Sequence, residues 1–214
     1  MPLLDLLPKD RLHCFGEDFA RSSNLTVLYP STIQQNLRLR VPFVVELFNV
    51  PFREQETICF YILDRLPRFQ HGAFDGRGNG QYLSERAAQR YGTARITQVM
   101  LTENWYREEM PKWKTHFEDG TIEVPKNDEH MEDYRAVKMV RGVPKIPDKK
   151  TGIGSASAGI VRHGDAAIAS CMMVYSSRQD GGEIEYQTLG PRGGSSDADF
   201  YGVPVMGRRD TMGF

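Results

Sequence analysis

The sequence predicts an α/β protein built on a mixed central β-sheet with helices on both faces. One observation predicts this class, and a second predicts where the folded domain ends. Through residue 175, short β-branched and aromatic segments alternate with longer segments that have apolar residues at helical spacing. From residue 176 to 214, in contrast, 8 of the 20 glycines occur and no apolar run is longer than two residues. We therefore expect one folded domain over residues 1–175 and a flexible, glycine-rich C-terminal tail over residues 176–214.

The composition is that of a soluble globular protein and excludes several functional classes. Of the 214 residues, 40% are hydrophobic and 26% are charged, and a net charge of −1 excludes a chain that is basic throughout. The three cysteines (Cys14, Cys59 and Cys171) lie far apart, which argues against a disulfide framework or a cysteine zinc site. Because the apolar runs are too short to span a bilayer and no basic segment precedes the N-terminal leucines, we expect a cytoplasmic protein.

Each expected element follows from a local pattern. Three closely spaced segments rich in β-branched and aromatic residues predict an antiparallel meander: Leu12–Gly16, Leu25–Tyr29 and Pro42–Val50. Apolar residues at helical spacing then predict a helix from Arg53 to Leu66, which Pro67 ends. The remaining elements are strands at 68–74, 94–101 and 121–124 and helices at 81–91, 105–117, 129–140 and 162–175. A meander followed by β-α-β units is the arrangement of RNase H-like folds.

Three aspartates lie where this arrangement would bring them together. Asp18 follows the first strand, Asp75 ends the strand after the first helix, and Asp165 lies near the start of the last helix. Clustered carboxylates are the ligands that Mg²⁺ and Mn²⁺ prefer, and two such ions can hydrolyse a phosphodiester without a protein nucleophile. We therefore predict that these aspartates are catalytic and bind two divalent cations. The alternative for each one alone is a helix cap or turn residue, a role for which Asp165 is well placed.

The strongest local signal is the glycine-rich turn Phe74-Asp-Gly-Arg-Gly-Asn-Gly-Gln81, between an expected strand and an expected helix. A dinucleotide-binding fingerprint has the same location. Its spacing fails here, because GxGxxG counted from Gly76 requires a small residue where the chain has Gln81. Asp75 would also place a negative charge beside the pyrophosphate. A strand end that binds metal therefore explains the turn better.

Several stretches, taken together, carry a family resemblance. They are Gly16-Glu-Asp-Phe-Ala-Arg21 with Asn24-Leu-Thr-Val27, Asn49-Val-Pro-Phe-Arg-Glu-Gln55, Asp75-Gly-Arg-Gly-Asn-Gly-Gln81 with Glu85, Phe117-Glu-Asp-Gly120 and Arg162-His-Gly-Asp165. This set resembles the nuclease domain of a bacteriophage terminase large subunit of the Mu-like type. The resemblance implies an RNase H/RuvC-like fold and metal-dependent cutting of concatemeric double-stranded DNA by Asp18, Asp75 and Asp165. It also implies a terminase small subunit and a portal or procapsid as partners, in the cytoplasm of a bacterial host.

The sequence departs from the family pattern in three respects. It has Asp18-Phe-Ala-Arg21 where the family commonly has Asp-Ile-Gly-Arg. It has Asn24-Leu25 where Asp-Leu is frequent, so an accessory acid at that position would be missing. Full-length large subunits also carry an ATPase whose P-loop requires Gly-Lys before Ser or Thr, and no Gly-Lys dipeptide occurs here. We therefore expect the chain to lack the motor and to be an excised domain or a natural truncation.

Further residues are expected to surround the three aspartates. Glu17 points to the other side of its strand if the strand continues, so it is expected to touch the metal ligands or to be exposed, and not to bind the metal. His163 and Glu85 are further candidates to touch the metal ligands; for His163 the alternatives are packing on the sheet and contact with the scissile phosphate. Candidate DNA contacts are the basic residues Arg21, Arg77, Lys149, Lys150 and Arg162. Lys149 and Lys150 belong to a basic, glycine-rich segment that could close on the DNA backbone; the alternative is a solvated linker.

Two other functions remain open from the sequence. The chain could be a docking module that binds the portal or procapsid through its tail, with suppressed or no nuclease activity. It could also be a resolvase or transposase of the same fold, although no dimerisation segment is visible. A plasmid-nicking assay in Mg²⁺, Mn²⁺ and EDTA separates the nuclease from the docking module.

Overall fold

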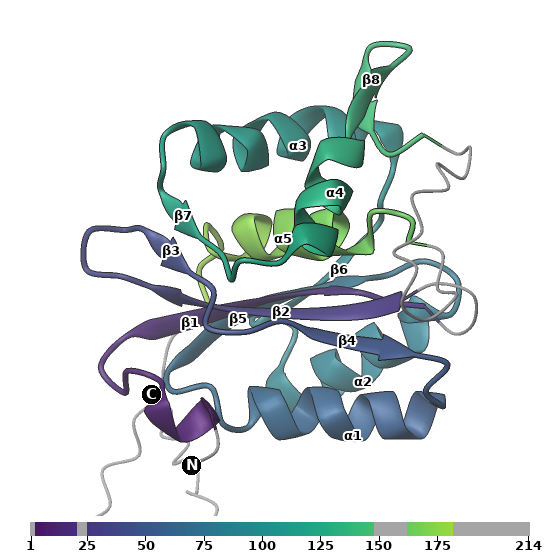
Figure 1. Ribbon diagram of the computed structural model, residues 1–214. Helices are drawn as coiled ribbons and strands as arrows, with labels where there is room; N and C mark the ends of the chain where they lie inside the picture. Colours follow the sequence, from purple (N-terminus) through teal and green to yellow (C-terminus); the bar gives the residue numbers. More distant parts are fainter. Residues whose placement is uncertain (1–2, 21–24, 148–161, 182–214) are drawn as a thin grey trace, which may run out of the picture. The chain divides into compact units, whose positions relative to one another are not determined.

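The computed structural model describes residues 3–20, 25–147 and 162–181. Within these ranges a seven-stranded sheet has the order β6-β5-β1-β2-β3-β7, with β4 also paired to β2, and β8 and β9 form a separate pair (Figure 1). The strands are β1 Leu12–Asp18, β2 Leu25–Ile33, β3 Leu39–Arg40, β4 Val45–Phe48, β5 Phe69–Asp75, β6 Ile96–Val99, β7 Ile122–Glu123, β8 Lys138–Val140 and β9 Val143–Lys145. The helices are a 3₁₀ turn η1 at Leu3–Leu6, then α1 Phe52–Leu63, α2 Gly80–Tyr91, α3 Glu103–Glu118, α4 Asp128–Ala136 and α5 Asp165–Ser176.

The strand pairing confirms the predicted mixed sheet. β2 runs antiparallel to β1 on one side and to β3 and β4 on the other, while β5 is parallel to β1, and β6 is parallel to β5. Strands β5 and β6 and the helix α2 between them form a β-α-β unit. Because β1 and β5 are parallel, their carboxyl ends lie at one end of the sheet, beside the start of β2. That end is where Asp18 and Asp75 are located.

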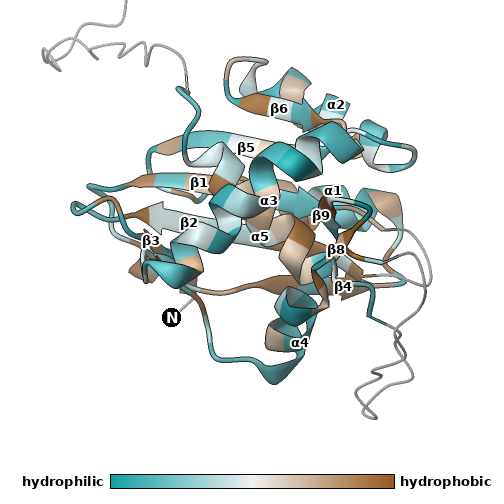
Figure 2. Cartoon of the chain, turned by 90° about the horizontal axis from the view of Figure 1, so that it is seen from above, coloured by the Kyte–Doolittle hydropathy of each residue, from teal (hydrophilic) through white to brown (hydrophobic). Residues whose placement is uncertain are grey.

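Helices cover both faces of the sheet. Helices α1 and α2 lie on one face, while α5 lies on the other, between the sheet and α3 (Figure 1). Side chains alternate along β1, so Cys14 packs in the cluster with α5, and Phe15 packs in the cluster with α1 and α2. Helix α5 carries mostly apolar residues (Figure 2), and all of its 12 residues except Tyr175 are buried. It is therefore the central helix of the domain.

Helix α5 lies directly against β1 because Gly16 has no side chain. A Cβ atom at this position would come 2.2 Å from the carbonyl oxygen of Ala169 and 2.4 Å from the nitrogen of Met173. Both are backbone atoms of α5, so no side-chain rotation could relieve the overlap. The small residues Ala166, Ala167 and Ala169 allow the same close approach from the helix side.

The structure differs from the expected elements at two helices. A helix was predicted over 129–140, but α4 ends at Ala136, and β8 and β9 form a hairpin. Arg141 and Gly142 take positive φ angles of 52° and 78° in its two-residue turn, which is typical of such hairpins. The last helix begins at Asp165 instead of Arg162, because Gly164 has a φ of 80°.

The folded region extends beyond the boundary expected at residue 175. Helix α5 continues to Ser176, whose hydroxyl donates to the carbonyl of His71 at 2.6 Å. The side-chain amide of Gln70 donates to the carbonyl of Gln179 at 2.7 Å. The rest of the expected tail, from residue 182, lies outside the described residues. No helix in the described ranges is long and apolar enough to cross a membrane.

The close contact at Gly16 predicts a large effect of one methyl group. Gly16→Ala should lower the free energy of unfolding by about 3 kcal/mol, because the methyl group would displace α5 from β1. The corresponding fall in melting temperature is roughly 6–12 °C. In the control Gly120→Ala, the Cβ would meet nothing within 4 Å, and only the φ of 61° opposes it, at a cost of about 1 kcal/mol. Equal losses in the two variants would contradict the packing argument.

Candidate active site

The fold brings the three predicted aspartates to one end of the sheet. Asp18 and Asp75 are the last residues of the neighbouring parallel strands β1 and β5. Asp165 is the first residue of α5, and its Oδ2 accepts a hydrogen bond of 3.4 Å from the backbone N–H of Leu25, where β2 begins. Asp75 and Asp165 are 7% and 6% exposed. All three carboxylates are therefore partly or largely withdrawn from solvent.

The aspartates act on one another electrostatically. Burial raises the pKa of Asp18 well above its usual value, and the negative charges of Asp165 and Asp75 raise it further. Burial raises the pKa of Asp165 to about 6, although the hydrogen bond from Leu25 opposes this. The pKa of Asp75 is also raised by burial, with Arg77 opposing. Without a bound cation, this end of the sheet therefore carries more negative charge than its surroundings stabilise.

Glu17 supports Asp75 from the opposite face of β1. Its side chain is completely buried, and its Oε2 accepts a hydrogen bond of 3.2 Å from the backbone N–H of Asp75. Burial is the main reason that the pKa of Glu17 is raised, and the charge of Asp75 adds to it. Glu17 also acts on the pKa of Cys59 in α1, which places it on the α1 side of the sheet. Glu17 thus links the ends of β1 and β5 on the face of the sheet that α1 covers.

The glycine-rich turn holds Arg77 beside Asp75. Asp75 Oδ1 accepts from the Arg77 backbone N–H at 3.0 Å and lies 3.4 Å from its Nε, while Arg77 Nη1 donates to the carbonyl of Leu101 at 2.9 Å. A Cβ at Gly80 would come 2.6 Å from the Asp75 carbonyl oxygen, so α2 begins against the end of β5 only because this residue is glycine. Asp75 therefore also stabilises the turn, which is the structural role considered for it above.

Arg162 has a different position from the one expected of a DNA contact. It is 8% exposed, and its guanidinium lies 2.6 Å from both Glu46 Oε1 and Asp133 Oδ2 and 3.4 Å from Glu129 Oε2. These partners come from β4 and α4. A buried guanidinium with three carboxylate partners is not available to a DNA phosphate. The sequence suggested DNA binding only because Arg162 is basic and lies three residues before Asp165.

Asp133 links this ion-pair network to the start of α5. Its Oδ2 also accepts a hydrogen bond of 3.2 Å from the backbone N–H of Ala166, the residue after Asp165. The carboxylate therefore satisfies one of the free N–H groups in the first turn of α5, as a cap residue would. Its charge also raises the pKa of Asp165. No sequence pattern identified Asp133, because it lies 32 residues before Asp165 on another helix.

Tyr106 is a second neighbour that the sequence did not reveal. It lies on α3, and its pKa is raised mainly by burial and next by the charge of Asp18, with Arg77 opposing. The phenol is thus close to the aspartates. In the sequence, Tyr106 is an aromatic residue next to Trp105 in an expected helix, and nothing distinguishes it from a core residue.

Of the remaining predicted site residues, the structure describes His163 and Glu85. The backbone of His163 makes a hydrogen bond with the Asp165 carboxylate, and its side chain is partly exposed. Glu85 is exposed on α2, where its Oε1 accepts from the side-chain amide of Gln81 at 2.7 Å. Arg21, Lys149 and Lys150 lie outside the described residues.

The donor chemistry of this end of the sheet fits a hard divalent cation. Carboxylate oxygens are the ligands that Mg²⁺ and Mn²⁺ prefer, and a bound cation would stabilise the ionised form of the three carboxyls, whose pKa values burial raises. The described ranges hold no three His, Cys, Asp or Glu side chains already gathered as metal ligands. The charges of Asp75 and Asp165 therefore act on Asp18, but the three side chains do not form a preassembled ligand shell in the described residues.

Comparison with known proteins yields two relatives and a fold. No protein-family model matches the chain. A protein of Escherichia phage Mu described as "Probable terminase, large subunit gp28" is 42% identical over 202 residues, which are 93% of this chain. The chain is a homologue of the gp28 proteins of Mu-like phages. The gp28 protein of the Mu-like prophage FluMu of Haemophilus influenzae is 41% identical over 189 residues, or 88% of the chain. The chain spans 36% of the length of each relative.

Solved structures confirm the RNase H-like fold. The large terminase nuclease of the thermophilic phage G20c, determined with bound magnesium, matches with a TM-score of 0.62 at 12% identity, over 81% of this chain and 95% of that one. The large terminase nuclease domain of Thermus phage P74-26 matches with a TM-score of 0.59 at 11% identity, over 80% and 92% of the two chains. The expected resemblance to a terminase large subunit of the Mu-like type is thus confirmed.

The ion-pair network predicts a defined pH dependence of stability. Burial alone would raise the pKa of Glu46, but hydrogen bonds from His130 and Arg162 outweigh it and lower the pKa to about 2. Because this pKa is below the unfolded value, the ionised carboxylate stabilises the fold above about pH 4.5, and this is lost as the pH falls toward 2. Glu46→Gln should therefore cost about 1–3 kcal/mol at pH 7, allowing for the partly exposed side chain, and much less at pH 3. Urea unfolding at both pH values measures this; an equal cost at both would contradict the pairing.

Proposed function

We propose that this chain is the metal-dependent endonuclease domain of a phage DNA-packaging terminase and cuts concatemeric double-stranded DNA by phosphodiester hydrolysis. The observation that carries the proposal is the convergence of Asp18, Asp75 and Asp165 from β1, β5 and α5 at one end of the sheet. The homology to gp28 proteins and the fold of terminase nucleases support it. The magnesium in the G20c structure supports the use of a divalent cation.

In this proposal Asp18, Asp75 and Asp165 hold two divalent cations, Mg²⁺ or Mn²⁺. When bound, such a pair supplies an activated water and stabilises the departing 3′ oxygen. The chain's own residues orient the ligands. Glu17 fixes the backbone of Asp75, and the Leu25 N–H orients the Asp165 carboxylate. Arg77 moderates the negative charge and is the described candidate for a phosphate contact, because 46% of its side chain is exposed.

Asp133 and Arg162 act as positioning residues for Asp165. Asp133 fixes the first turn of α5 through the Ala166 N–H, and Arg162 holds Asp133 against Glu46 on β4. Glu46 is paired in register with Val27, two residues along β2 from Leu25, which contacts Asp165 directly. The strand pair β2–β4 therefore supports Asp165 in two ways. Leu25 of β2 contacts its carboxylate directly, and Glu46 of β4 acts on the start of α5 through Arg162 and Asp133.

The remaining partners are proposed from homology. Double-stranded DNA would be the substrate, and the terminase small subunit and a portal or procapsid would be partners in the cytoplasm of the bacterial host. The motor ATPase would lie outside this sequence, which has no Gly-Lys dipeptide. A docking module that binds the portal or procapsid, with suppressed or no nuclease activity, is the alternative, and nicking by the wild type separates the two.

Asp75→Asn separates a catalytic role from a structural one. Asparagine can still accept the Arg77 N–H and stabilise the turn, so the melting temperature in EDTA should be unchanged or slightly higher as repulsion falls. Nicking of supercoiled plasmid in Mn²⁺ should fall by about 100-fold or more, because one metal ligand is neutralised. Asp5→Asn, at an exposed aspartate of η1 that belongs to no predicted site, is the matched control and should nick normally. Nicking by Asp75→Asn at the wild-type rate would refute the proposal, and absence of nicking by the wild type would favour the docking module.

Asp133→Asn tests the positioning role. Asparagine can still cap Ala166 but weakens the pair with Arg162, so the Mn²⁺ concentration for half-maximal nicking should rise roughly tenfold. Glu132→Gln changes the exposed neighbour on α4 and should leave it unchanged. An identical Mn²⁺ dependence in both variants would show that Asp133 does not act through Asp165.

A further inference from the structure

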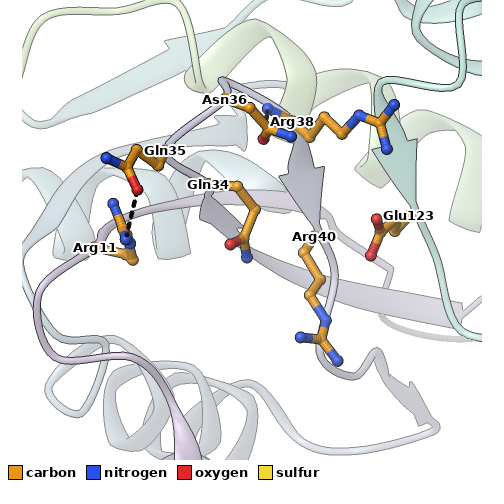
Figure 3. A pocket seen from close by; sticks show the side chains of 7 residues that line it. All are labelled: Arg11, Gln34, Gln35, Asn36, Arg38, Arg40 and Glu123. Carbon is orange, nitrogen blue, oxygen red and sulfur yellow. Dashed lines mark hydrogen bonds between the residues drawn. The ribbon is translucent and has the colours of Figure 1, made fainter.

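A second concave surface lies at the other end of β2 from the three aspartates. It is a hollow of about 550 Å³ between the start of β1, the turn from β2 to β3, and β7 (Figure 3). All of its lining residues are polar or charged: Arg11, Gln34, Gln35, Asn36, Arg38, Arg40 and Glu123. Three arginines against one glutamate give the lining a charge of +2, whereas the whole chain has −1. Positive charge is thus concentrated here.

The guanidinium groups of this hollow are available to a ligand. Neither Arg38 nor Arg40 makes a side-chain hydrogen bond or ion pair with any residue of the described ranges, and both are exposed. Arg11 is engaged more loosely, at 3.3 Å from Asp10 and 3.5 Å from Gln35. Figure 3 shows the three guanidinium groups spread around the hollow, not gathered at one point. That spread suits an extended polyanion better than one small anion.

The backbone holds these arginines in place. β3 lies between β2 and β7, and the Leu39 and Val41 N–H groups donate to the carbonyls of Thr121 and Glu123 at 2.9 and 2.8 Å. The Gln34 N–H closes the turn by donating to the carbonyl of Arg38 at 2.8 Å. Arg38 and Arg40 are therefore presented from a fixed strand, so only their side chains must become ordered when a ligand binds.

We propose that this hollow binds the phosphate backbone of duplex DNA, as a second contact for the substrate of the proposed nuclease, on which this inference rests. Protein interfaces are anchored by buried aromatic and aliphatic side chains, and the lining of this hollow has none. Phosphate and sugar contacts are instead made by arginine, asparagine and glutamine, which form most of this lining.

The length of β2 sets the spacing of the two DNA contacts. Leu25, at the start of β2, touches Asp165, and Gln34 follows its last residue, Ile33. A nine-residue strand extends over about 26 Å. At a rise of about 3.4 Å per base pair, this corresponds to about eight base pairs of duplex. The hollow would therefore hold the backbone about eight base pairs from the cleaved bond and add affinity without reading bases.

The test is DNA binding in EDTA, where no cutting occurs. Fluorescence anisotropy with labelled hairpin duplexes of 6 and 24 base pairs, of which only the longer can span both contacts, compares the wild type with Arg38→Gln/Arg40→Gln between 50 and 200 mM NaCl. The variant should bind the 24-base-pair duplex about tenfold more weakly, and the slope of log affinity against log salt should fall by about 1.8, for two lost phosphate contacts. Lengthening the duplex should strengthen binding by the wild type more than by the variant.

A matched control and a competing ligand keep the proposal falsifiable. Arg65→Gln/Arg95→Gln also removes two charges, at positions outside the hollow, and should keep the wild-type slope. Equal behaviour of the two double variants would overturn the proposal. It would also be overturned if Arg38→Gln/Arg40→Gln kept DNA binding but lost binding of a labelled 20-residue polyglutamate peptide, because that result would indicate an acidic protein partner. A wild type that binds DNA through Arg38 and Arg40 but never nicks plasmid would refute the nuclease and leave the DNA contact standing.

Discussion

The direct contact between α5 and β1 is the constraint on which the rest of the structure depends. Gly16 leaves no space between the strand and the backbone of α5 at Ala169 and Met173. This contact fixes α5 along the sheet, so its first residue, Asp165, lies at the end where β1 and β5 finish. A bulkier residue in β1 would displace the helix and its carboxylate together. The position of the Asp165 carboxylate therefore depends on the core packing at Gly16.

The buried and half-buried acids near that end are of two kinds. Glu46 and Asp133 face Arg162, and the hydrogen bonds from Arg162 and His130 lower the pKa of Glu46. Asp18 and Asp165 have raised pKa values, because burial and neighbouring carboxylates outweigh the stabilisation they receive. Paired acids stabilise the fold, whereas repelling acids lower its stability and persist where a cation compensates for them. The same end of the domain thus combines a stable frame with a site that attracts cations.

The sequence predicted the parts of the fold that local patterns encode. The three closely spaced strand segments, Pro67 after α1 and the glycine-rich turn after β5 were sufficient for the sheet and for the placement of Asp18 and Asp75 at strand ends. Long-range partners were not predictable. Arg162 was expected to contact DNA, because nothing local shows that Glu46 and Asp133 surround it. Strand β8 was interpreted as the end of a helix over 129–140, because its apolar residues continue the spacing of α4 and only Gly142 indicates the turn.

The central claim is that Asp18, Asp75 and Asp165 together bind divalent cations, and Mn²⁺ binding measured by electron paramagnetic resonance tests it most directly. Free Mn²⁺ gives a sharp signal that disappears on binding, so the measurement requires neither DNA nor activity. The account predicts that the wild-type chain binds Mn²⁺ and that Asp18→Asn loses this binding while keeping the wild-type melting temperature in EDTA. It also predicts proton release on binding at pH 6, because the pKa values of these carboxyls are raised. Equal Mn²⁺ binding by the wild type and Asp18→Asn would contradict the account.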